Sequence, residues 1–280
     1  MRIYKNSSYL VHRFPKHDVG TPTLRVSDLT LRYGNVDALT GISFEVSVSE
    51  RLAVVGPNGA GKSTLFKIIA GVLRPTQGSV QIYGYEPKGH ICIAYVPQRN
   101  QVDWSFPVDV ADVVMMGRIS KMGLLRWPST NDWDLVHHSL ELVGMDGFSK
   151  NQINELSGGQ QQRIFIARAL AQEAELILLD EPLTGLDINT QQDIFRILDK
   201  LRQKRVTVII AMHDLKLASE RFDRVMLLNK RVLGIGLPHE VFVPDKLMLA
   251  YGDHLRMLTT KEGVLMIEDT CCEEGDHPHA

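Results

Sequence analysis

The sequence has few cysteines, little net charge and no long apolar run, and each shortage excludes a class of protein. Three cysteines in 280 residues, two of them adjacent, form no disulfide framework and fit a reducing compartment. Lys plus Arg number 31 against 33 Asp plus Glu, and a net charge of −2 argues against nucleic acid as a partner. The longest apolar stretches, such as 176–179 and 206–212, are far shorter than the ~20 residues of a membrane-spanning helix. Residues 1–20 scatter charges among apolar positions, unlike a secretory segment, so we expect the protein to stay where it is made.

The residues that are present, 44% of them hydrophobic, predict a packed α/β core of one or two domains. Short, almost wholly apolar segments are typical of parallel strands covered by helices on both faces, and they occur at 51–56, 91–96, 175–180 and 206–212. Residues 24–33, with one slip in phase, and 42–48 alternate apolar with polar positions, which predicts an antiparallel β-subdomain. Apolar residues recur at helical spacing in 164–171 and 194–201.

Between about residues 99 and 156 the strand patterns give way to helix-like sequence that is interrupted by Pro107 and Pro128. We interpret this segment as a helical subdomain inserted into the parallel core sheet. A short helix at 244–251 and a hairpin turning at 261–263 are expected later in the chain. The predicted divisions are an N-terminal extension at 1–22, a main domain at 23–243, a C-terminal helix and hairpin at 244–270 and a flexible acidic tail at 271–280.

The tail carries side chains that bind metals, namely Cys271, Cys272, His277 and His279. Thiolates and imidazoles so close together could hold Zn²⁺ or Mn²⁺. Adjacent cysteines lack the Cys-x-x-Cys spacing of common structural zinc sites, so a solvated acidic tail is the interpretation that we favour.

A glycine-rich segment follows the apolar strand at 52–55 and opens a predicted helix. Eight residues match the phosphate-loop pattern G-x-x-x-x-G-K-[ST], namely Gly56, Pro57, Asn58, Gly59, Ala60, Gly61, Lys62 and Ser63. Thr64, the next residue, is a further candidate for binding the nucleotide. Backbone N–H groups of such a loop and the start of its helix face phosphate oxygens. Lys62 supplies a positive charge to the β and γ phosphates, and the Ser63 hydroxyl can ligate Mg²⁺.

Two acidic residues, Asp180 and Glu181, end the apolar run at 176–179. The carboxyl ends of strands are where open α/β sheets bind their ligands. Asp180 is suited to holding Mg²⁺ through water, and Glu181 can act as the general base that polarises an attacking water. Acidic residues are also common in loops after strands, and the phosphate loop upstream is what favours the catalytic interpretation.

A second anion-binding helix start is predicted at residues 156–160, which read Leu-Ser-Gly-Gly-Gln. With the phosphate loop before it, this signature segment resembles that of the ATP-binding-cassette (ABC) transporter ATPase subunits. The resemblance covers about residues 24–243 and implies a P-loop NTPase cassette that binds ATP and Mg²⁺ and hydrolyses ATP.

The resemblance also implies roles for single residues. Tyr33 matches the aromatic residue that stacks on adenine, although a strand aromatic can equally belong to a core. Gln98 matches the glutamine that contacts Mg²⁺ and the attacking water. His213 matches the histidine that reaches the γ-phosphate. The implied catalytic residues are therefore Glu181, His213, Gln98 and Lys62, and the implied Mg²⁺ ligands are Ser63, Gln98 and Asp180.

In such cassettes the nucleotide lies between two copies. The resemblance implies that the residues meeting the ATP of the opposite subunit are Ser157, Gly158, Gly159 and Gln160. The segment 183–187, which ends at Asp187, matches the loop that crosses to that subunit. A chain with one cassette then implies a dimer with two ATP molecules, formed by two copies or by a paired homologue.

The segments 99–110 and 113–118 resemble the cassette subunits of manganese, zinc and iron uptake systems. The resemblance implies a peripheral ATPase on the cytoplasmic face of the membrane that energises uptake of a divalent metal, with manganese favoured. Its partners would be integral-membrane permease subunits and, through them, a metal-binding solute receptor. Trp104 and Phe106 are candidate anchors for a permease helix, unless they pack inside the helical subdomain. The alternative is a soluble, non-transport ABC ATPase with a mechanical or regulatory role.

Overall fold

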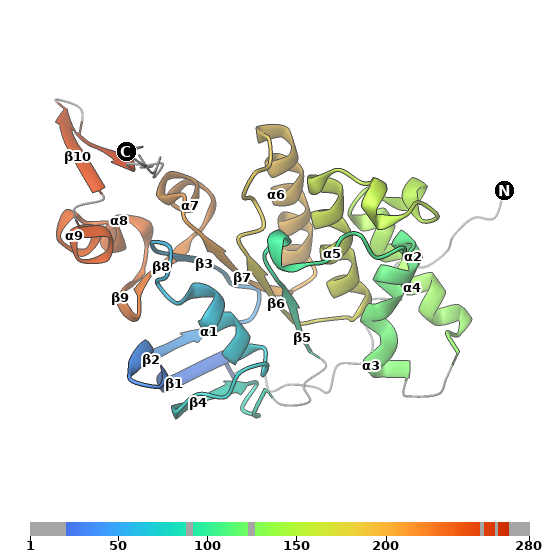
Figure 1. The fold of residues 1–280 in the computed structure, drawn as a ribbon, viewed down its shortest axis with the longest axis horizontal. Coiled ribbons are helices and arrows are strands. Elements are labelled where there is room, and N and C mark those ends of the chain that lie inside the picture. Colours follow the sequence, from blue (N-terminus) through green and yellow to red (C-terminus); the bar gives the residue numbers. More distant parts are fainter. Residues whose placement is uncertain (1–20, 88–91, 123–126, 253–254, 261–262, 269–280) are drawn as a thin grey trace, which may run out of the picture.

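The computed structural model describes residues 21–87, 92–122, 127–252, 255–260 and 263–268. Its centre is a mixed sheet of strand order β5-β6-β7-β3-β8-β9, parallel except for the edge strand β9 (Figure 1). The strands are β3 (Arg51–Val55), β5 (Ile93–Val96), β6 (Leu176–Asp180), β7 (Thr207–Met212), β8 (Arg224–Asn229) and β9 (Arg231–Gly236). The parallel core sheet expected from the apolar runs is thus confirmed, whereas β8 and β9 were not expected from the sequence.

A smaller antiparallel sheet has the order β2-β1-β4, formed by β1 (Leu24–Tyr33), β2 (Val36–Val46) and β4 (Gln77–Ile82). The phase slip in the sequence of β1 corresponds to a break in its pairing with β2 between Val26 and Leu29. Asp28 takes a left-handed φ of 47° at this bulge. The extra residue there moves the apolar side chains of β1 back onto the buried face.

Helices cover both faces of the central sheet and form the helical subdomain beside it. They are α1 (Lys62–Ile69), α2 (Val110–Met115), α3 (Ile119–Met122), α4 (Thr130–Leu142), α5 (Gly158–Ala171), α6 (Ile188–Gln203), α7 (Leu215–Arg221), α8 (Pro238–Val241) and α9 (Pro244–Tyr251). One apolar core joins α1 and the smaller sheet to one face of the central sheet. A second core joins α5 and α6 to the other face and continues into α2 and α4. The sheet is therefore buried on both faces, which explains its apolar strands.

The chain after α9 forms the expected hairpin, β10 (Leu255–Thr260) with β11 (Gly263–Glu268). Most of the predicted N-terminal extension and the whole tail with its cysteines and histidines lie outside the described residues. Within the described part of the chain, no helix is long and apolar enough to cross a membrane.

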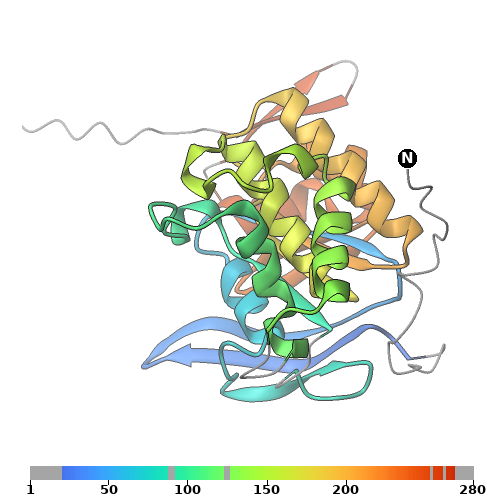
Figure 2. The ribbon, with the colours of Figure 1, turned by 90° about the vertical axis from the view of Figure 1, so that its right-hand side faces the viewer.

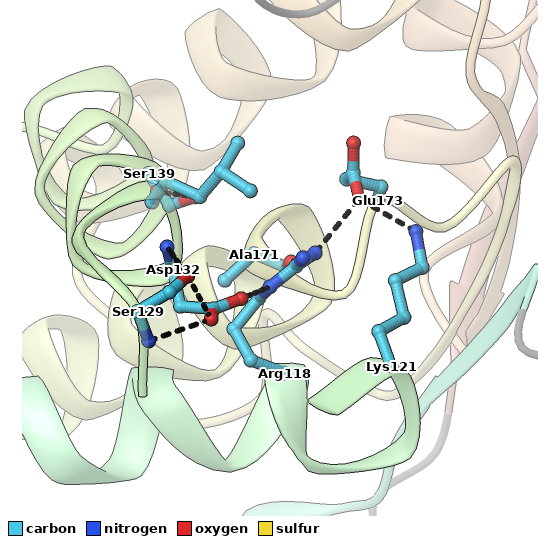
Figure 3. Close-up of polar contacts among 8 residues, drawn as sticks. Arg118, Lys121, Ser129, Asp132, Ser139, Ala171 and Glu173 are labelled. Carbon is cyan, nitrogen blue, oxygen red and sulfur yellow. Dashed lines mark hydrogen bonds and ion pairs between the residues drawn. The ribbon is translucent and has the colours of Figure 1, made fainter. Parts of the chain in front are cut away.

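The helical subdomain consists of α2, α3 and α4, of which α2 and α4 pack against α5 (Figure 2). A buried ion-pair network ties these helices together around Arg118, which is 6% exposed (Figure 3). Arg118 Nε donates to Asp132 Oδ1 at 3.0 Å, and its Nη1 donates to Glu173 Oε2 at 2.7 Å and to the carbonyl of Ala171 at 2.9 Å. Lys121 Nζ also donates to Glu173 Oε2, at 2.7 Å. Every contact joins segments that are distant in sequence, so the network fixes the position of α4 against the end of α5.

We expect Arg118→Met to lower the free energy of unfolding by about 3–5 kcal/mol, because it leaves Asp132 buried without its cation and the partly buried Glu173 with Lys121 as its remaining cation. Denaturant unfolding of the purified protein measures this loss. The matched control is Arg25→Met, which breaks an exposed pair with Glu45 and should cost less than about 1 kcal/mol. Equal losses in the two variants would contradict the structural role of the network.

The same network predicts a pH dependence of stability. Burial raises the pKa of Asp132, but hydrogen bonds from Ser129 and Arg118 outweigh burial and hold the pKa below its ordinary value. Burial likewise opposes the Lys121 and Arg118 contacts that lower the pKa of Glu173. A lowered folded-state pKa stabilises the fold above the unfolded-state pKa, roughly 4, and this contribution is lost as the pH falls further. The unfolding free energy of Arg118→Met should therefore depend less on pH below about 4 than that of the parent.

Candidate functional site

The carboxyl ends of β5, β6, β7 and β3 lie beside one another at one edge of the central sheet (Figure 1). Their register aligns Val96 with Leu179, Asp180 with Ala211 and Val55 with Met212. The residues that follow each strand therefore meet at this edge, and they include Gln98, Glu181, His213 and the phosphate loop. The pairing of the strands thus gathers motifs that the sequence spreads over more than half of the chain.

The phosphate loop (residues 56–63) curls back so that the Lys62 ammonium lies against the backbone of its own loop. Lys62 Nζ donates to the carbonyls of Gly56 at 2.7 Å and Pro57 at 3.1 Å, and only 5% of the residue is exposed. Gly56 lies so close to the Leu228 carbonyl of β8 that a Cβ would clash with it. Gly61 caps α1 with a φ of 96°, which an L side chain rarely adopts. Packing therefore requires glycine at position 56, and the backbone conformation favours it at position 61.

A brace from the β8–β9 turn supports this loop, and nothing in the sequence indicates it. Lys230 N donates to the carbonyl of Ala60 at 2.8 Å, and the Lys230 carbonyl accepts from Thr40 N at 2.7 Å. Lys230 has a left-handed φ of 56°, as the turn requires. The brace links the phosphate loop to both the central and the smaller sheet.

Asp180 ends β6 and is 1% exposed. Its Oδ2 accepts a hydrogen bond from Tyr95 Oη at 3.1 Å, whereas its Oδ1 is buried without a hydrogen-bond partner among the described residues. Burial raises the pKa of Asp180, and the nearby hydroxyls of Ser63 and Tyr95 oppose that shift. Burial and this carboxylate raise the pKa of Tyr95, so its hydroxyl stays protonated. An unpaired buried carboxylate oxygen close to a serine hydroxyl fits the oxygen ligands that Mg²⁺ prefers.

The Glu181 carboxylate lies between the side chains of Gln98 and Lys62, two of the candidate catalytic residues. Gln98 Nε2 donates to Glu181 Oε2 at 3.0 Å, and Lys62 Nζ lies 3.5 Å from Glu181 Oε1. The backbone of Glu181 has a left-handed φ of 48°, and its N–H donates to the Ala211 carbonyl of β7 at 3.1 Å. The strand β6 therefore ends directly before Glu181.

His213 and Tyr33 are both exposed. His213 follows the last residue of β7, and the next residue, Asp214, caps α7 by accepting from Leu217 N at 2.8 Å. Tyr33 ends β1 with 55% of its surface exposed, so the interpretation of Tyr33 as a core aromatic is wrong. The paired strand β2 reaches the phosphate loop, where Leu39 packs against Gly61. An exposed ring is available for stacking.

The signature segment begins α5 with a reciprocal capping box. Ser157 Oγ accepts from Gln160 N, and Gln160 Oε1 accepts from Ser157 N at 2.8 Å. Gly159 lies directly against Thr190 of α6, where a Cβ would clash with the threonine methyl group. Asp187 Oδ1 caps α6 through Asn189 N and Thr190 N. The structure thus places the start of α5, with the signature segment, beside the start of α6, which Asp187 caps.

Arg99 connects the Glu181 site to the signature helix. It follows Gln98, and its Nε donates to Gln161 Oε1 of α5 at 3.0 Å. The Gln161 side chain in turn donates to the Ile153 carbonyl at 3.1 Å and is 3% exposed. The residue next to Gln98 is therefore tied to α5 and, through Gln161, to the segment that precedes it.

The two candidate docking aromatics differ in their surroundings. Trp104 packs edge-on against Phe165 of α5 with ring centroids 5.0 Å apart, and its Nε1 donates to the Arg99 carbonyl at 2.9 Å. Phe106 is 61% exposed. The packing alternative therefore holds for Trp104, and Phe106 keeps the surface position that an anchor needs.

Residues 39–184 match the family model for ABC transporters, and the chain belongs to this family. The chain is therefore an ATP-binding cassette, a member of a family of ATPases. The chain is 42% identical over 248 residues to the manganese transport system ATP-binding protein MntB of Halalkalibacterium halodurans, covering 88% of this chain and 98% of the relative. It is 45% identical to the manganese transport system ATP-binding protein MntA of Synechocystis, and the match covers 88% of this chain and 95% of that relative. It is 42% identical to the zinc transport system ATP-binding protein TroB of Treponema pallidum, with 83% of this chain and 88% of that relative covered.

The fold agrees with this family. A solved structure described as a metal-chelate type ABC transporter in an inward-facing conformation superposes with a TM-score of 0.75 at 29% identity. The match covers 88% of this chain and 96% of that chain. A P-loop cassette with the β-subdomain and helical subdomain expected from the sequence is thus confirmed.

Proposed function

We propose that this chain is the ATP-hydrolysing subunit of an ABC importer for a divalent metal ion, with manganese favoured over zinc and iron. The observation that carries the proposal is the similarity to manganese transport ATP-binding proteins over almost their entire length. The relatives include zinc and iron proteins at similar identity, so the cassette itself does not select the metal. The ion would pass through the permease, and the cassette would supply the energy.

Within this proposal each residue at the sheet edge has one task. Lys62 binds the β and γ phosphates, together with the backbone of residues 56–64. Ser63, Asp180 and Gln98 would hold Mg²⁺, which when bound neutralises charge on the phosphates. Glu181 takes a proton from the attacking water, and His213 contacts the γ-phosphate. The Gln98–Glu181 hydrogen bond of 3.0 Å supports this division of roles.

The other proposed contacts to the nucleotide come from residues that do not lie at the carboxyl edge of the central sheet. Tyr33 stacks on adenine, for which its exposure is suited. The signature segment, with Ser157, Gly158, Gly159 and Gln160, binds the γ-phosphate of the ATP held by a second cassette. Asp187 shapes the loop that faces that cassette, and its capping contacts to Thr190 keep the loop beside the signature segment.

We further propose that the cassette works at the cytoplasmic face of the membrane, bound to permease subunits that receive metal from a solute receptor. Two measurements test this. The chain should co-purify with an integral-membrane permease, and cells lacking it should lose uptake of radioactive manganese, restored by the parent gene but not by a hydrolysis-deficient variant. Normal manganese uptake in the deleted cells would refute the metal assignment. A complex with soluble proteins alone would favour the mechanical or regulatory role.

Phe106→Ala is expected to weaken permease binding while the fold remains intact. A buried aromatic anchor contributes on the order of 2 kcal/mol to an interface, equivalent to about a thirtyfold loss of affinity. Trp104→Ala, in contrast, removes the contact with Phe165 and should lower the unfolding free energy by on the order of 2 kcal/mol. Co-purification with the permease and thermal melting distinguish the two. Unchanged permease binding by Phe106→Ala would remove Phe106 from the interface.

A further inference from the structure

Tyr95 lies near the carboxyl end of β5 and belongs to none of the motifs. It lies in β5 directly beside Leu178 of the parallel strand β6. Leu178 and Asp180 are two residues apart, so their side chains point to the same face, which is also the face of Tyr95 and of α1. The Tyr95 phenol on β5 is thus placed near the Asp180 carboxylate, which lies two residues beyond Leu178 toward the end of β6. The hydroxyl donates to Asp180 Oδ2 at 3.1 Å.

We propose that Tyr95 is a positioning residue for the divalent cation that accompanies ATP, acting by holding the Asp180 carboxylate through Oδ2 and leaving Oδ1 for the cation shell. This inference rests on the proposed role of Asp180 in holding Mg²⁺. The division between the two oxygens is visible in the structure, since Oδ2 has a partner and the buried Oδ1 has none among the described residues.

The reason for such a residue is the freedom of an aspartate side chain. The terminal torsion of a carboxylate is broad, so burial alone does not decide which oxygen faces the ligand. A hydrogen bond from a ring fixed in a packed strand removes that freedom. Tyr95 is suited to this task because its ring packs against the core on the α1 face, while its hydroxyl reaches the Asp180 carboxylate. The metal site is then arranged before the cation binds, which reduces the ordering that binding requires.

The test compares Tyr95→Phe with Tyr83→Phe. Both changes remove one phenolic hydroxyl from a tyrosine of the same apolar core. The Tyr83 hydroxyl contacts Thr23, far along the chain from Asp180. ADP binding is measured by calorimetry for each variant and the parent, once with excess Mg²⁺ and once with a chelator. The Mg²⁺ concentration that gives half-maximal ATP hydrolysis is measured in parallel, and thermal melting monitors the fold.

We expect Tyr95→Phe to raise the half-maximal Mg²⁺ concentration by about tenfold, because a hydrogen bond to a charged group is lost. The Mg²⁺-dependent part of the ADP affinity should shrink, while binding in the chelator stays as in the parent. Tyr83→Phe should change neither quantity. If Tyr95→Phe leaves the Mg²⁺ dependence unchanged, or weakens metal-free binding equally, the inference is wrong.

Asp180→Asn separates failure of the inference from failure of the proposed function. This change should remove most of the Mg²⁺-dependent part of ADP binding, whatever Tyr95 does. If it does so and Tyr95→Phe has no effect, only the role of Tyr95 is refuted. If Asp180→Asn itself leaves Mg²⁺-dependent binding intact, the cation is held elsewhere and both the proposed site and the inference are refuted.

Discussion

Glu181→Gln is expected to slow ATP hydrolysis by a factor of about 10²–10⁴ and to leave ATP affinity within a few-fold of the parent. The substitution keeps the size of the side chain and an oxygen that can accept the Gln98 hydrogen bond seen at 3.0 Å. It removes the carboxylate charge, which in the proposed mechanism takes the proton from water and which also faces Lys62 at 3.5 Å. Phosphate release under single-turnover conditions measures the rate, and calorimetry measures ATP binding.

The same variant should accumulate as an ATP-bound dimer, because nucleotide stays trapped between the two cassettes. Size-exclusion chromatography with and without ATP detects this change. The control is Glu220→Gln, an exposed glutamate of α7 that should leave rate and oligomeric state unchanged. Turnover of Glu181→Gln at close to the parent rate would assign the general base to another residue.

Lys62→Ala is the second change with a large expected effect, and it acts on binding. The variant should bind ATP about a hundredfold more weakly or worse, because a charged donor to the phosphates is lost. The position of Lys62 is already fixed by carbonyls of its own loop, so little ordering is needed when phosphate binds. Its removal also takes away the cation that lies 3.5 Å from Glu181 Oε1.

Equilibrium binding of a fluorescent ATP analogue measures this loss directly. Lys67→Ala is the matched control, since Lys67 lies in the last turn of the same helix α1, away from the phosphate loop. ATP binding by Lys67→Ala should equal that of the parent. If Lys62→Ala retained tight ATP binding with a parental melting temperature, Lys62 would not be the phosphate ligand.

The sequence by itself determined those features that depend on neighbouring residues. The glycines and Lys62 of the phosphate loop, the capping pattern of the signature segment and the apolar strands are local, because backbone conformation and burial on both faces impose them along one stretch of chain. The break in β1 was also visible as a phase slip in the sequence. These features sufficed for the fold class, the nucleotide and the family.

Strands β4 and β9 were missed, because runs of six residues with polar or glycine positions are defined as strands only by the partners beside them. Strand β8 was also missed, although its apolar run 225–228 has the pattern of the other buried strands. Gly56 shows the consequence, since the strand that forbids a side chain there is β8. The sequence also left undecided whether Trp104 and Phe106 are buried or exposed, because composition does not reveal which of the two packs against Phe165.

Only the tertiary structure decided how the separate motifs complete one another. The hydrogen bond from Tyr95 to Asp180 spans 85 positions in sequence, and the brace from Lys230 to the Ala60 carbonyl joins a turn to the phosphate loop. Neither contact leaves a local pattern, since any strand residue can be tyrosine and any turn residue offers a backbone N–H. The register between parallel strands creates both, and register is set by long-range packing of the whole sheet.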